Sequence, residues 1–360
     1  MPRRAAVKLS TIADRLGVST ATVSLALRDS PDVAERTRQK VKAEAEALGY
    51  IHNRRAASLR TQRSGIVGVV VHDVMNPFYG EIIRAVETEL DREQQTFMLC
   101  NHYDDRNKQR TFVETLLQLG ADGVIMSPSI GTTEKDLRIA TRNGMPVVLV
   151  ARSVDGFDGP TFRGDDAFGI SLATRHLISL GHTKIAMVGG TDATSTGRDR
   201  YRGYVQALEY AGLKADPHLR IPGPRTKRAG FEAATEFLSL RQHPTAAVCW
   251  NDLVAIGMMN GIARAGLRPG EDISVTGYDD LEEAAIATPS LTTVWNGQHE
   301  AGRQAARALQ ALIGRERSDE HDDDRATAAR PGSDGARTDD GTILIRPSLR
   351  IRDSTRRLIR

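Results

Sequence analysis

Residues 12–24 have the sequence IADRLGVSTATVS, and the order of residue types in this segment determines how the chain begins to fold. A helix-turn-helix needs a small residue in its first helix, so that the second can pack closely, and a glycine at the turn. It also needs an apolar residue that fills the core and a polar N-cap that starts the second helix. Ala13, Gly17, Val18 and Ser19 meet these needs in that order. The segment therefore predicts a helix-turn-helix, the alternative being an ordinary helical hairpin.

Apolar spacing around this segment predicts three short helices. The first covers about residues 9–16, the second runs from Ser19 to about residue 27, and the third covers about 34–48. Val23 has the spacing of a core residue, so the opposite face of the second helix is expected to be exposed. That outer face holds Thr20, Ala21, Ser24 and Leu25.

The beginning of the chain is basic and the rest is mildly acidic. Residues 1–63 contain 13 Lys and Arg against 6 Asp and Glu, a net charge of +7, whereas the whole chain of 360 residues has +3. The remainder therefore has a net charge of −4. A basic segment of this kind is typical of nucleic-acid binding. A solvated basic tail would give the same charge.

From residue 66 onward, apolar β-branched runs alternate with amphipathic stretches. Continuous apolar strands separated by helices are typical of parallel sheets covered on both faces. About 275 residues are many for one open sheet, so two lobes with a cleft between them are expected. The predicted strands are Ile66–Val71, Phe97–Cys100, Val124–Met126, Val147–Val150, Ile185–Val188, Ala246–Cys249 and Ile273–Thr276.

Composition limits the class of protein further. No apolar run approaches the roughly 20 residues of a membrane span, and the basic N-terminus lacks the apolar region of a signal peptide. Cys100 and Cys249 lie in apolar, strand-like surroundings and are expected to be reduced core residues without a catalytic or metal role. We therefore expect a cytoplasmic protein that needs no metal or other cofactor.

Residues 315–341 contain no Val, Ile, Leu, Met or aromatic residue, so they cannot bury enough apolar surface to offset the entropy of ordering. We expect a disordered loop there, followed by a last strand at Thr342–Ile345. His321 and Asp322–Asp324 could be imagined as a metal site, but a solvated acidic run is the favoured interpretation.

Nearly the full length of the chain resembles the lactose-repressor (LacI) family of bacterial regulators. The matching stretches are IADRLGVSTATVS, TRQKVKAEAEALGY, NRRAASLR, VGVVV...NPFYGEI, ADGVIMSP, HLISLGHTKIAMVGG, RDRYRGY, WNDLVAIG and ISVTGYDDLEEA...PSLTTV. The resemblance implies an all-α helix-turn-helix domain at 1–52, a hinge helix or linker at 53–63 and an effector-binding and dimerisation core at 64–360. That core would be α/β and two-lobed, like the periplasmic sugar-binding proteins, although the chain lacks their export signal.

The resemblance also implies which residues of the first domain contact DNA. In the family, residues just after the N-cap of the second helix contact bases, and these correspond to Thr20 and Ala21, with Leu25 one turn later. Leu25 cannot donate a hydrogen bond, so it is limited to a thymine methyl group or the backbone. Arginines are expected to contact phosphates. The predicted DNA-binding residues are Ser19, Thr20, Ala21, Thr22, Ser24, Leu25 and Arg28, with further phosphate contacts from Arg36, Arg38, Arg54 and Arg55.

Residues 53–63 are similar to the family's hinge helix, which folds on cognate DNA in the minor groove. Asn53, Arg54, Ala57 and Leu59 match its pattern, and a leucine at the position of Leu59 is the family's wedge at a central base step. The alternative for Leu59 is an exposed leucine in a linker. Paired hinge helices imply a homodimer on a near-palindromic operator, with a higher oligomer also possible.

Family effector-binding positions fall after the predicted strands, at the edge where ligands bind in open α/β sheets. Polar groups around aromatic faces suit a polyhydroxylated ligand, so a sugar or sugar derivative is expected. Asn76 has the alternative of starting a helix, and Asp252 that of capping one. The predicted effector-binding residues are His72, Asn76, Phe78, Tyr79, Ser127, Arg200, Arg225, Trp250, Asn251 and Asp279.

Arg225 departs from the family, because several relatives have an aromatic residue at about this place before Gly230. If Arg225 faces the cleft, it joins Arg200 and His72 in favouring an anionic or phosphorylated ligand. If it faces solvent, it says nothing about the ligand.

An enzyme is the rival interpretation of the α/β region. No G-x-G-x-x-G follows the first strand, no G-x-x-x-x-G-K-[ST] occurs, and no nucleophile elbow is visible. We therefore predict a DNA-binding transcriptional regulator, most consistent with a repressor, that is not an enzyme and does not bind membranes.

Overall fold

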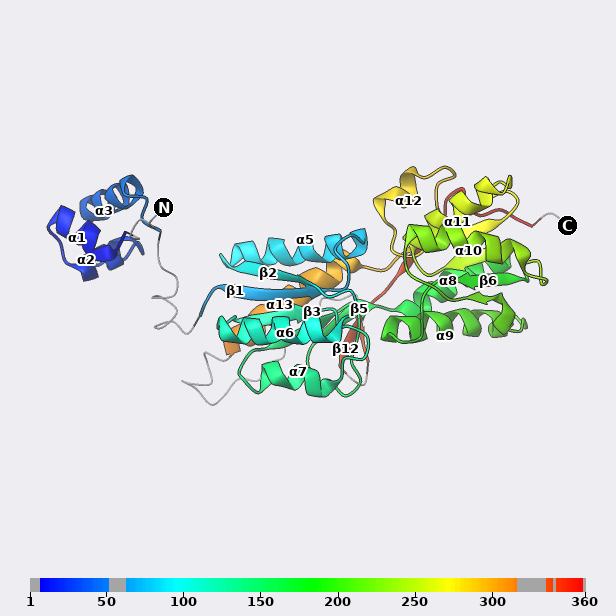
Figure 1. The fold of residues 1–360 in the computed structure, drawn as a ribbon, viewed down its shortest axis with the longest axis horizontal. Coiled ribbons are helices and arrows are strands. Elements are labelled where there is room, and N and C mark those ends of the chain that lie inside the picture. Colours follow the sequence, from blue (N-terminus) through cyan, green and yellow to red (C-terminus); the bar gives the residue numbers. More distant parts are fainter. Residues whose placement is uncertain (1–6, 52–62, 316–334, 339–340, 359–360) are drawn as a thin grey trace. The chain divides into compact units, whose positions relative to one another are not determined.

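The computed structural model describes residues 7–51, 63–315, 335–338 and 341–358 (Figure 1). The chain divides into two compact units, Met1–Ser64 and Gly65–Arg360. The predicted hinge residues Asn53, Arg54, Ala57 and Leu59 lie outside the described residues, as does the run from His321 to Asp324.

The first unit, called the head here, contains the predicted helix-turn-helix. Its helices are α1 (Leu9–Leu16), α2 (Thr20–Ala26) and α3 (Glu35–Ala47). Gly17 ends α1 with a φ of 65°, a left-handed conformation that glycine adopts without strain. The Ser19 hydroxyl accepts a hydrogen bond from the Thr22 amide at 3.0 Å, so Ser19 is the N-cap of α2. Ile12, Val23 and Val41 are fully buried between the three helices.

The second unit is an α/β core of two lobes. The N-lobe, defined as residues 65–164, 298–315 and 335–345, has a seven-stranded sheet in the order β11-β12-β5-β4-β3-β1-β2, in which only the edge strand β11 is antiparallel to its neighbour. Its strands are β1 (Ile66–Val71), β2 (Thr96–Asn101), β3 (Gly123–Met126), β4 (Val147–Val150), β5 (Thr161–Gly164), β11 (Gly335–Arg337) and β12 (Thr342–Ile345).

Helices cover both faces of the N-lobe sheet (Figure 1). One face packs on α5 (Pro77–Arg92) and α13 (Gln298–Arg315), and the other packs on α6 (Arg106–Gln118) and α7 (Glu134–Thr141). Each face has its own apolar core because neighbouring residues of a strand point to opposite sides. Val69 of β1 packs toward α5, whereas Val70 packs toward α6.

The C-lobe, defined as residues 165–295 and 348–358, has a four-stranded parallel sheet in the order β7-β6-β8-β9. The helix pairs α8–α9 and α10–α11 pack against it around one shared core. Its elements are α8 (Asp166–Ser179), β6 (Ile185–Val188), α9 (Ser195–Tyr210), a short 3₁₀ helix (Pro217–Leu219), β7 (Arg220–Ile221), α10 (Lys227–Ser239), β8 (Ala246–Cys249), α11 (Asp252–Arg264), β9 (Ser274–Thr276) and α12 (Glu282–Ile286).

The chain passes between the lobes after β5, after β10 (Thr293–Trp295) and between β12 and β13 (Ser348–Arg350). β10 and β13 form a two-stranded antiparallel ribbon. Because the main sheet strands of each lobe are parallel, loops from their carboxyl ends gather where the lobes meet, which is where a ligand site is expected in open α/β sheets.

All the strands predicted from apolar runs are present, within one residue at each end. β5 was missed because its sequence, TFRG, has no continuous apolar run, although all four residues are buried. One prediction is wrong: Gly335–Arg337, assigned to a disordered loop, pairs with β12 as an edge strand. An edge strand can be held by backbone hydrogen bonds alone, so the lack of apolar side chains did not prevent it.

Among the helices that the structure describes, none is long and apolar enough to cross a membrane. Cys100 and Cys249 are both buried free cysteines. Burial raises the pKa of each thiol, and for Cys249 the pKa lies far above its ordinary value. Both residues belong to apolar cores, as expected.

The close packing of α10 and α11 yields a stability prediction. A Cβ atom on Gly257 would lie 1.9 Å from the Lys227 carbonyl oxygen, so Gly257→Ala would force these helices apart. We expect a loss of about 1–3 kcal/mol in the free energy of unfolding, as in overpacked cores. Gly80→Ala in α5 is the matched control, since a Cβ atom added there would have no other atom within 4 Å. That variant should gain up to ~1 kcal/mol from helix propensity. Equal denaturation midpoints for the two variants would contradict this view of the packing.

Candidate functional site

The exposed surface of the head centres on the start of α2. Thr20, Ala21 and Arg28 are exposed, and Thr22 and Ser24 are half-buried. Ser19 is also exposed, although its hydroxyl contacts Thr22 through both the amide and the side chain. The first turn of α2 therefore offers short side chains to a neighbouring molecule.

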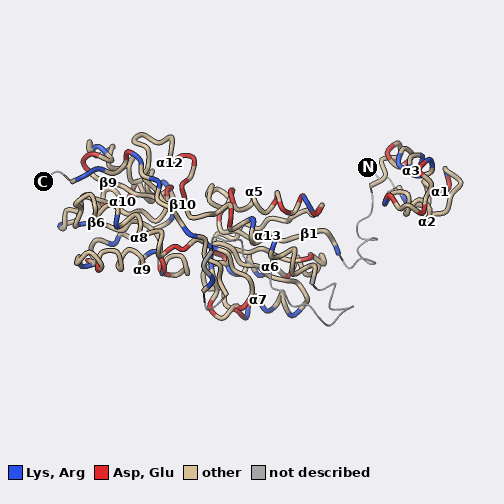
Figure 2. Tube along the Cα trace, turned by 180° about the vertical axis from the view of Figure 1, so that it is seen from behind, with Lys and Arg blue, Asp and Glu red and all other residues tan. Residues whose placement is uncertain are grey.

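Two predicted DNA contacts have other roles within the head. Leu25 is half-buried and packs against the head core, which leaves little of its side chain for a thymine methyl group. Arg38 donates from Nη1 to the carbonyl oxygens of Ser30 and Val33, each at 2.8 Å, and pairs with Glu35. It closes the loop before α3, whereas Arg36 is exposed. Basic and acidic residues both lie along α3 (Figure 2).

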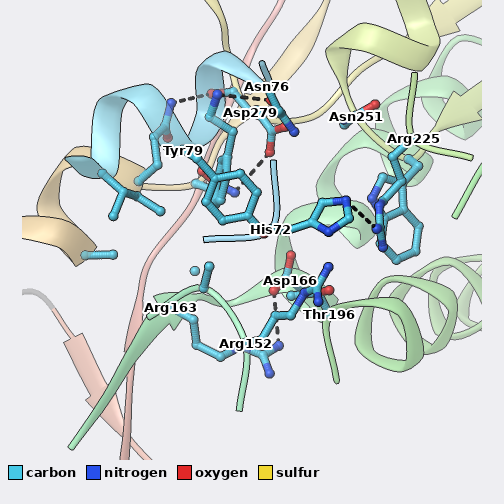
Figure 3. Close-up of a pocket in the computed structure, with 18 of the residues that line it drawn as sticks. His72, Asn76, Tyr79, Arg152, Arg163, Asp166, Thr196, Arg225, Asn251 and Asp279 are labelled. Atoms are coloured by element: carbon cyan, nitrogen blue, oxygen red, sulfur yellow. Dashed lines mark hydrogen bonds and ion pairs between the residues drawn. The ribbon is translucent and has the colours of Figure 1, made fainter. Parts of the chain in front are cut away.

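A pocket lined by residues of both lobes lies between the lobes of the core, the kind of place where small-molecule sites are found. Nine of the ten predicted effector-binding residues line it, including Arg225 (Figure 3). Ser127 is the exception, because it is fully buried behind the wall, 3.3 Å from the Tyr79 hydroxyl. The nine are His72, Asn76, Phe78, Tyr79, Arg200, Arg225, Trp250, Asn251 and Asp279.

The start of α5 supplies the aromatic wall. The Asn76 side chain accepts a hydrogen bond from the Phe78 amide at 3.0 Å, so Asn76 caps the helix while lining the pocket. Phe78 and Tyr79 stack edge to face with ring centroids 5.0 Å apart. In the C-lobe, Asn251 caps α11 in the same way through the Val254 amide. Both asparagines thus combine the capping role with a place in the wall.

Arg200 of α9 organises the C-lobe wall. Its Nε donates to Asp166 at 2.8 Å, its Nη1 donates to the Trp250 carbonyl oxygen at 2.6 Å, and its Nη2 lies 3.8 Å from Asp279. The guanidinium also lies 3.9 Å from the centroid of the Tyr278 ring. Burial alone would lower the pKa of Arg200, but the two carboxyl groups outweigh it and raise that pKa. Arg200 therefore holds Trp250 and Asp279 in place.

Arg163 extends this network into the N-lobe. It lies on β5, pairs with Asp166 at 3.1 Å and with Asp199, and donates to the Ser153 hydroxyl at 3.2 Å. Asp166 thus accepts from an arginine of each lobe. The result is a chain of buried charges across the junction between the lobes.

A second group of charges, called the interlobe cluster here, consists of His72, Asp104, Arg152 and Arg225. Arg225, between β7 and α10, donates from Nη2 to Asp104 at 2.8 Å and to His72 Nε2 at 2.9 Å. Figure 3 shows the contact with His72. Arg152, after β4, donates to the other oxygen of Asp104 at 2.5 Å. Burial would raise the pKa of Asp104, but the two guanidiniums outweigh it and hold that pKa below its ordinary value.

The His72 imidazole is neutral in this cluster. Burial lowers its pKa to about 4, and Arg225 adds to the effect while Asp104 opposes it. The hydrogen bond from Arg225 agrees with this, because a guanidinium only donates and Nε2 must accept.

His72, His102 and Asp104 lie close enough together to suggest a metal site. However, His102 Nδ1 accepts from the Asp104 amide at 2.9 Å, and its Nε2 lies 2.9 Å from the Ser127 carbonyl oxygen. Both ring nitrogens of His102 are therefore engaged, and Asp104 already binds two arginines. This arrangement favours an ion-pair cluster over a metal centre.

Several buried polar atoms around the pocket have no hydrogen-bond partner within the described part of the chain. Among the residues that line the pocket, they are His72 Nδ1, Arg163 Nε, Asn296 Oδ1 and Gln298 Oε1. His72 Nδ1 lies 3.1 Å from Asp104 without forming a hydrogen bond of good geometry. The amide groups of the same Asn296 and Gln298 donate to Asp279, at 3.3 Å to its carboxyl and 2.8 Å to its carbonyl oxygen. Native structures rarely leave buried polar atoms unpaired without a reason. A polar ligand in the pocket would supply the missing partners.

Sequence reasoning missed several residues of the pocket wall. Arg152 follows a strand that was predicted, so its place at a carboxyl strand end was a usable signal. Arg163 and Asp166 adjoin the unpredicted β5, and Asn296 and Gln298 follow the unpredicted β10, so they had no such signal.

Two family models match the chain. Residues 8–53 match the model described as bacterial regulatory proteins, lacI family. Residues 64–329 match that of periplasmic binding proteins and the sugar-binding domain of the LacI family.

Curated relatives and solved structures agree with these models. The transcriptional repressor PurR of Pectobacterium carotovorum is 32% identical over 87% of this chain and 92% of its own length. The transcriptional regulator GalR of Escherichia coli is 33% identical over 79% of this chain and 83% of its own. The lac repressor dimer bound to operator and an anti-inducer superposes with a TM-score of 0.82 at 26% identity, covering 98% of this chain and all of that one.

The neutral His72 makes stability depend on pH. The unfolded chain takes up this proton near pH 6.5 and the folded core only near 4, so stability falls as pH falls through that window. Between pH 7 and pH 4.5, we expect the free energy of unfolding to fall less for His72→Gln than for the wild type. The difference should be about 1–2 kcal/mol after allowing for solvent screening.

Urea denaturation at each pH measures this, with the exposed His218→Gln as control. Parallel pH profiles for wild type and His72→Gln would show that His72 is not held neutral by the fold.

Proposed function

The chain belongs to the LacI family of bacterial regulatory proteins, and we propose that it represses transcription as a homodimer bound to a near-palindromic operator, under the control of a small molecule in the interlobe pocket. Its family membership makes it a DNA-binding transcriptional repressor and not an enzyme. The dimer, the form of the operator and the ligand are the proposed parts. Such a regulator acts where the chromosome lies, in the cytoplasm.

The observation that carries the DNA-binding proposal is the capped, exposed start of α2 within the segment matched by the regulatory-protein model. Thr20 and Ala21 are proposed to contact bases there, and Arg28 to contact a phosphate. Short side chains at these positions favour contacts with methyl groups and DNA shape over long bidentate hydrogen bonds.

The hinge role of residues 53–63 and the wedge role of Leu59 complete this proposal. Two-fold pairing of such segments over the operator would explain why the target is near-palindromic. A change in the separation or angle of the lobes would then alter hinge pairing and thus operator affinity.

The unpaired buried atoms around the pocket support a polar ligand, and Phe78, Tyr79 and Trp250 supply apolar faces beside them. This combination suits a sugar or a sugar derivative. A ligand that binds one arrangement of the lobes more tightly than another would shift the equilibrium between the two arrangements.

The proposal is tested by selecting DNA from a random pool with the full-length protein. The affinity of the protein for the selected sequence is then measured by mobility shift. We expect a near-palindromic consensus and an affinity that falls steeply with salt, because phosphate contacts release counterions. Binding without sequence preference would refute the operator proposal. A monomer on DNA by analytical ultracentrifugation would refute the homodimer.

Arg28 allows a sharper test. Arg28→Ala should weaken binding about equally on all sequences and lower the salt slope by about 1, as expected for one lost phosphate contact. Arg84→Ala is the control, because Arg84 is also exposed but lies on α5 of the α/β core. This variant should leave both the DNA affinity and its salt slope unchanged. A loss confined to the consensus sequence would instead place Arg28 at a base.

A further inference from the structure

The interlobe cluster has an excess of positive charge. Two guanidiniums, Arg152 and Arg225, share the single carboxylate of Asp104, and His72 between them is neutral. The cluster therefore has a net charge of +1 while its side chains are largely shielded from solvent, with Arg152 only 6% and Arg225 18% exposed. Unbalanced charge in such a place costs free energy unless a counter-charge approaches it.

The donors that would bind a counter-charge are still free. Within the described part of the chain, Arg225 makes its hydrogen bonds only through Nη2, and Arg152 only through Nη1. A guanidinium has five N–H groups, so each has its Nε and one further nitrogen left. Both side chains line the pocket.

Hydrogen-bond acceptors, in contrast to the arginine donors, lie at another part of the same pocket wall. The unpaired Asn296 Oδ1 and Gln298 Oε1 accept hydrogen bonds, and neither is suited to an anion. The two sets of groups therefore suit two parts of one ligand, an anionic group beside the arginines and hydroxyl groups beside the amides.

We propose that the ligand of this pocket is an anionic sugar derivative, whose phosphate or carboxylate binds the free N–H groups of Arg152 and Arg225 together. This inference rests on the proposed function, since it specifies the ligand of the proposed regulator. Arg152 belongs to the N-lobe and Arg225 to the C-lobe, so one anionic group bound to both holds the lobes together. Arg225 is then the specificity-determining residue, because planar bidentate donors favour phosphate and carboxylate.

Trp250 provides a direct readout of binding. It lines the pocket beside Arg200, and a Trp295→Phe background leaves it as the sole tryptophan. The fluorescence of this protein is titrated with inorganic phosphate, glucose 6-phosphate, gluconate and glucose, with sodium chloride holding the ionic strength constant. We expect saturable changes with at least one anionic probe and a much weaker response to glucose. Tighter binding of glucose 6-phosphate than of inorganic phosphate would identify a sugar phosphate as the source of the anion.

The same titrations with Arg225→Gln should give about tenfold weaker binding of the anionic probe, equivalent to one lost charge-assisted hydrogen bond. Arg225→Lys should recover part of the loss, because it restores the charge without the planar pair of donors. Arg228→Gln, on the exposed side of α10, is the matched control and should bind as the parent does. Circular dichroism melting of each variant separates lost affinity from lost folding.

The proposal is overturned if no anionic probe gives a saturable response, if glucose binds as tightly as glucose 6-phosphate, or if Arg225→Gln leaves the anion affinity unchanged. Operator binding by the same protein is measured in parallel. Specific DNA binding together with a neutral ligand would remove this inference and leave the proposed function standing. Absence of specific DNA binding would remove the proposed function, whatever the phosphate titration gives.

Discussion

The buried guanidinium of Arg200 is the interaction on which the junction of the lobes depends. A charge taken out of water is tolerated only when it is paired and hydrogen-bonded, and Arg200 meets this need through Asp166, Asp279 and the Trp250 carbonyl oxygen. These partners come from separate segments that follow β5, β8 and β9. Satisfying one cation thus fixes the positions of three loops at once, and the pocket wall takes its shape from them.

The polar groups that line the pocket differ from one another in how completely they are paired. Arg200 has partners around its guanidinium, whereas Arg163 Nε and the side-chain oxygens of Asn296 and Gln298 have none in the described chain. Paired charges that hold the wall in place, beside unpaired hydrogen-bonding atoms on the same wall, are the arrangement expected of a preorganised site. The framework keeps its geometry without ligand, and the ligand's gain comes from the atoms left over.

The sequence predicted the strands of the two sheets better than the residues that line the pocket. Regular apolar runs such as Val147–Val150 identify buried strands because a parallel strand is covered on both faces. β5 and β10 lack that signal, since their buried residues are partly polar and find their partners only in the folded chain. Arg225 shows a further limit: its position in the sequence left open whether it faced solvent or the cleft. Contacts with His72 and Asp104, 153 and 121 residues away, decide that question, and no local pattern encodes them.

The two charge networks contribute differently to the contact between the lobes. The Arg163–Asp166–Arg200 network is buried and paired through several bonds, so breaking it would leave charges unsatisfied in the interior. The interlobe cluster joins the lobes through Nη2 of one arginine, Arg225, and is partly open to solvent. Separation of the lobes should therefore begin at the interlobe cluster. The buried network should stay intact and lie near the axis of the movement. A ligand that contacts Arg225 acts on the less buried of these two networks, where a modest difference in binding energy between lobe positions can shift the equilibrium.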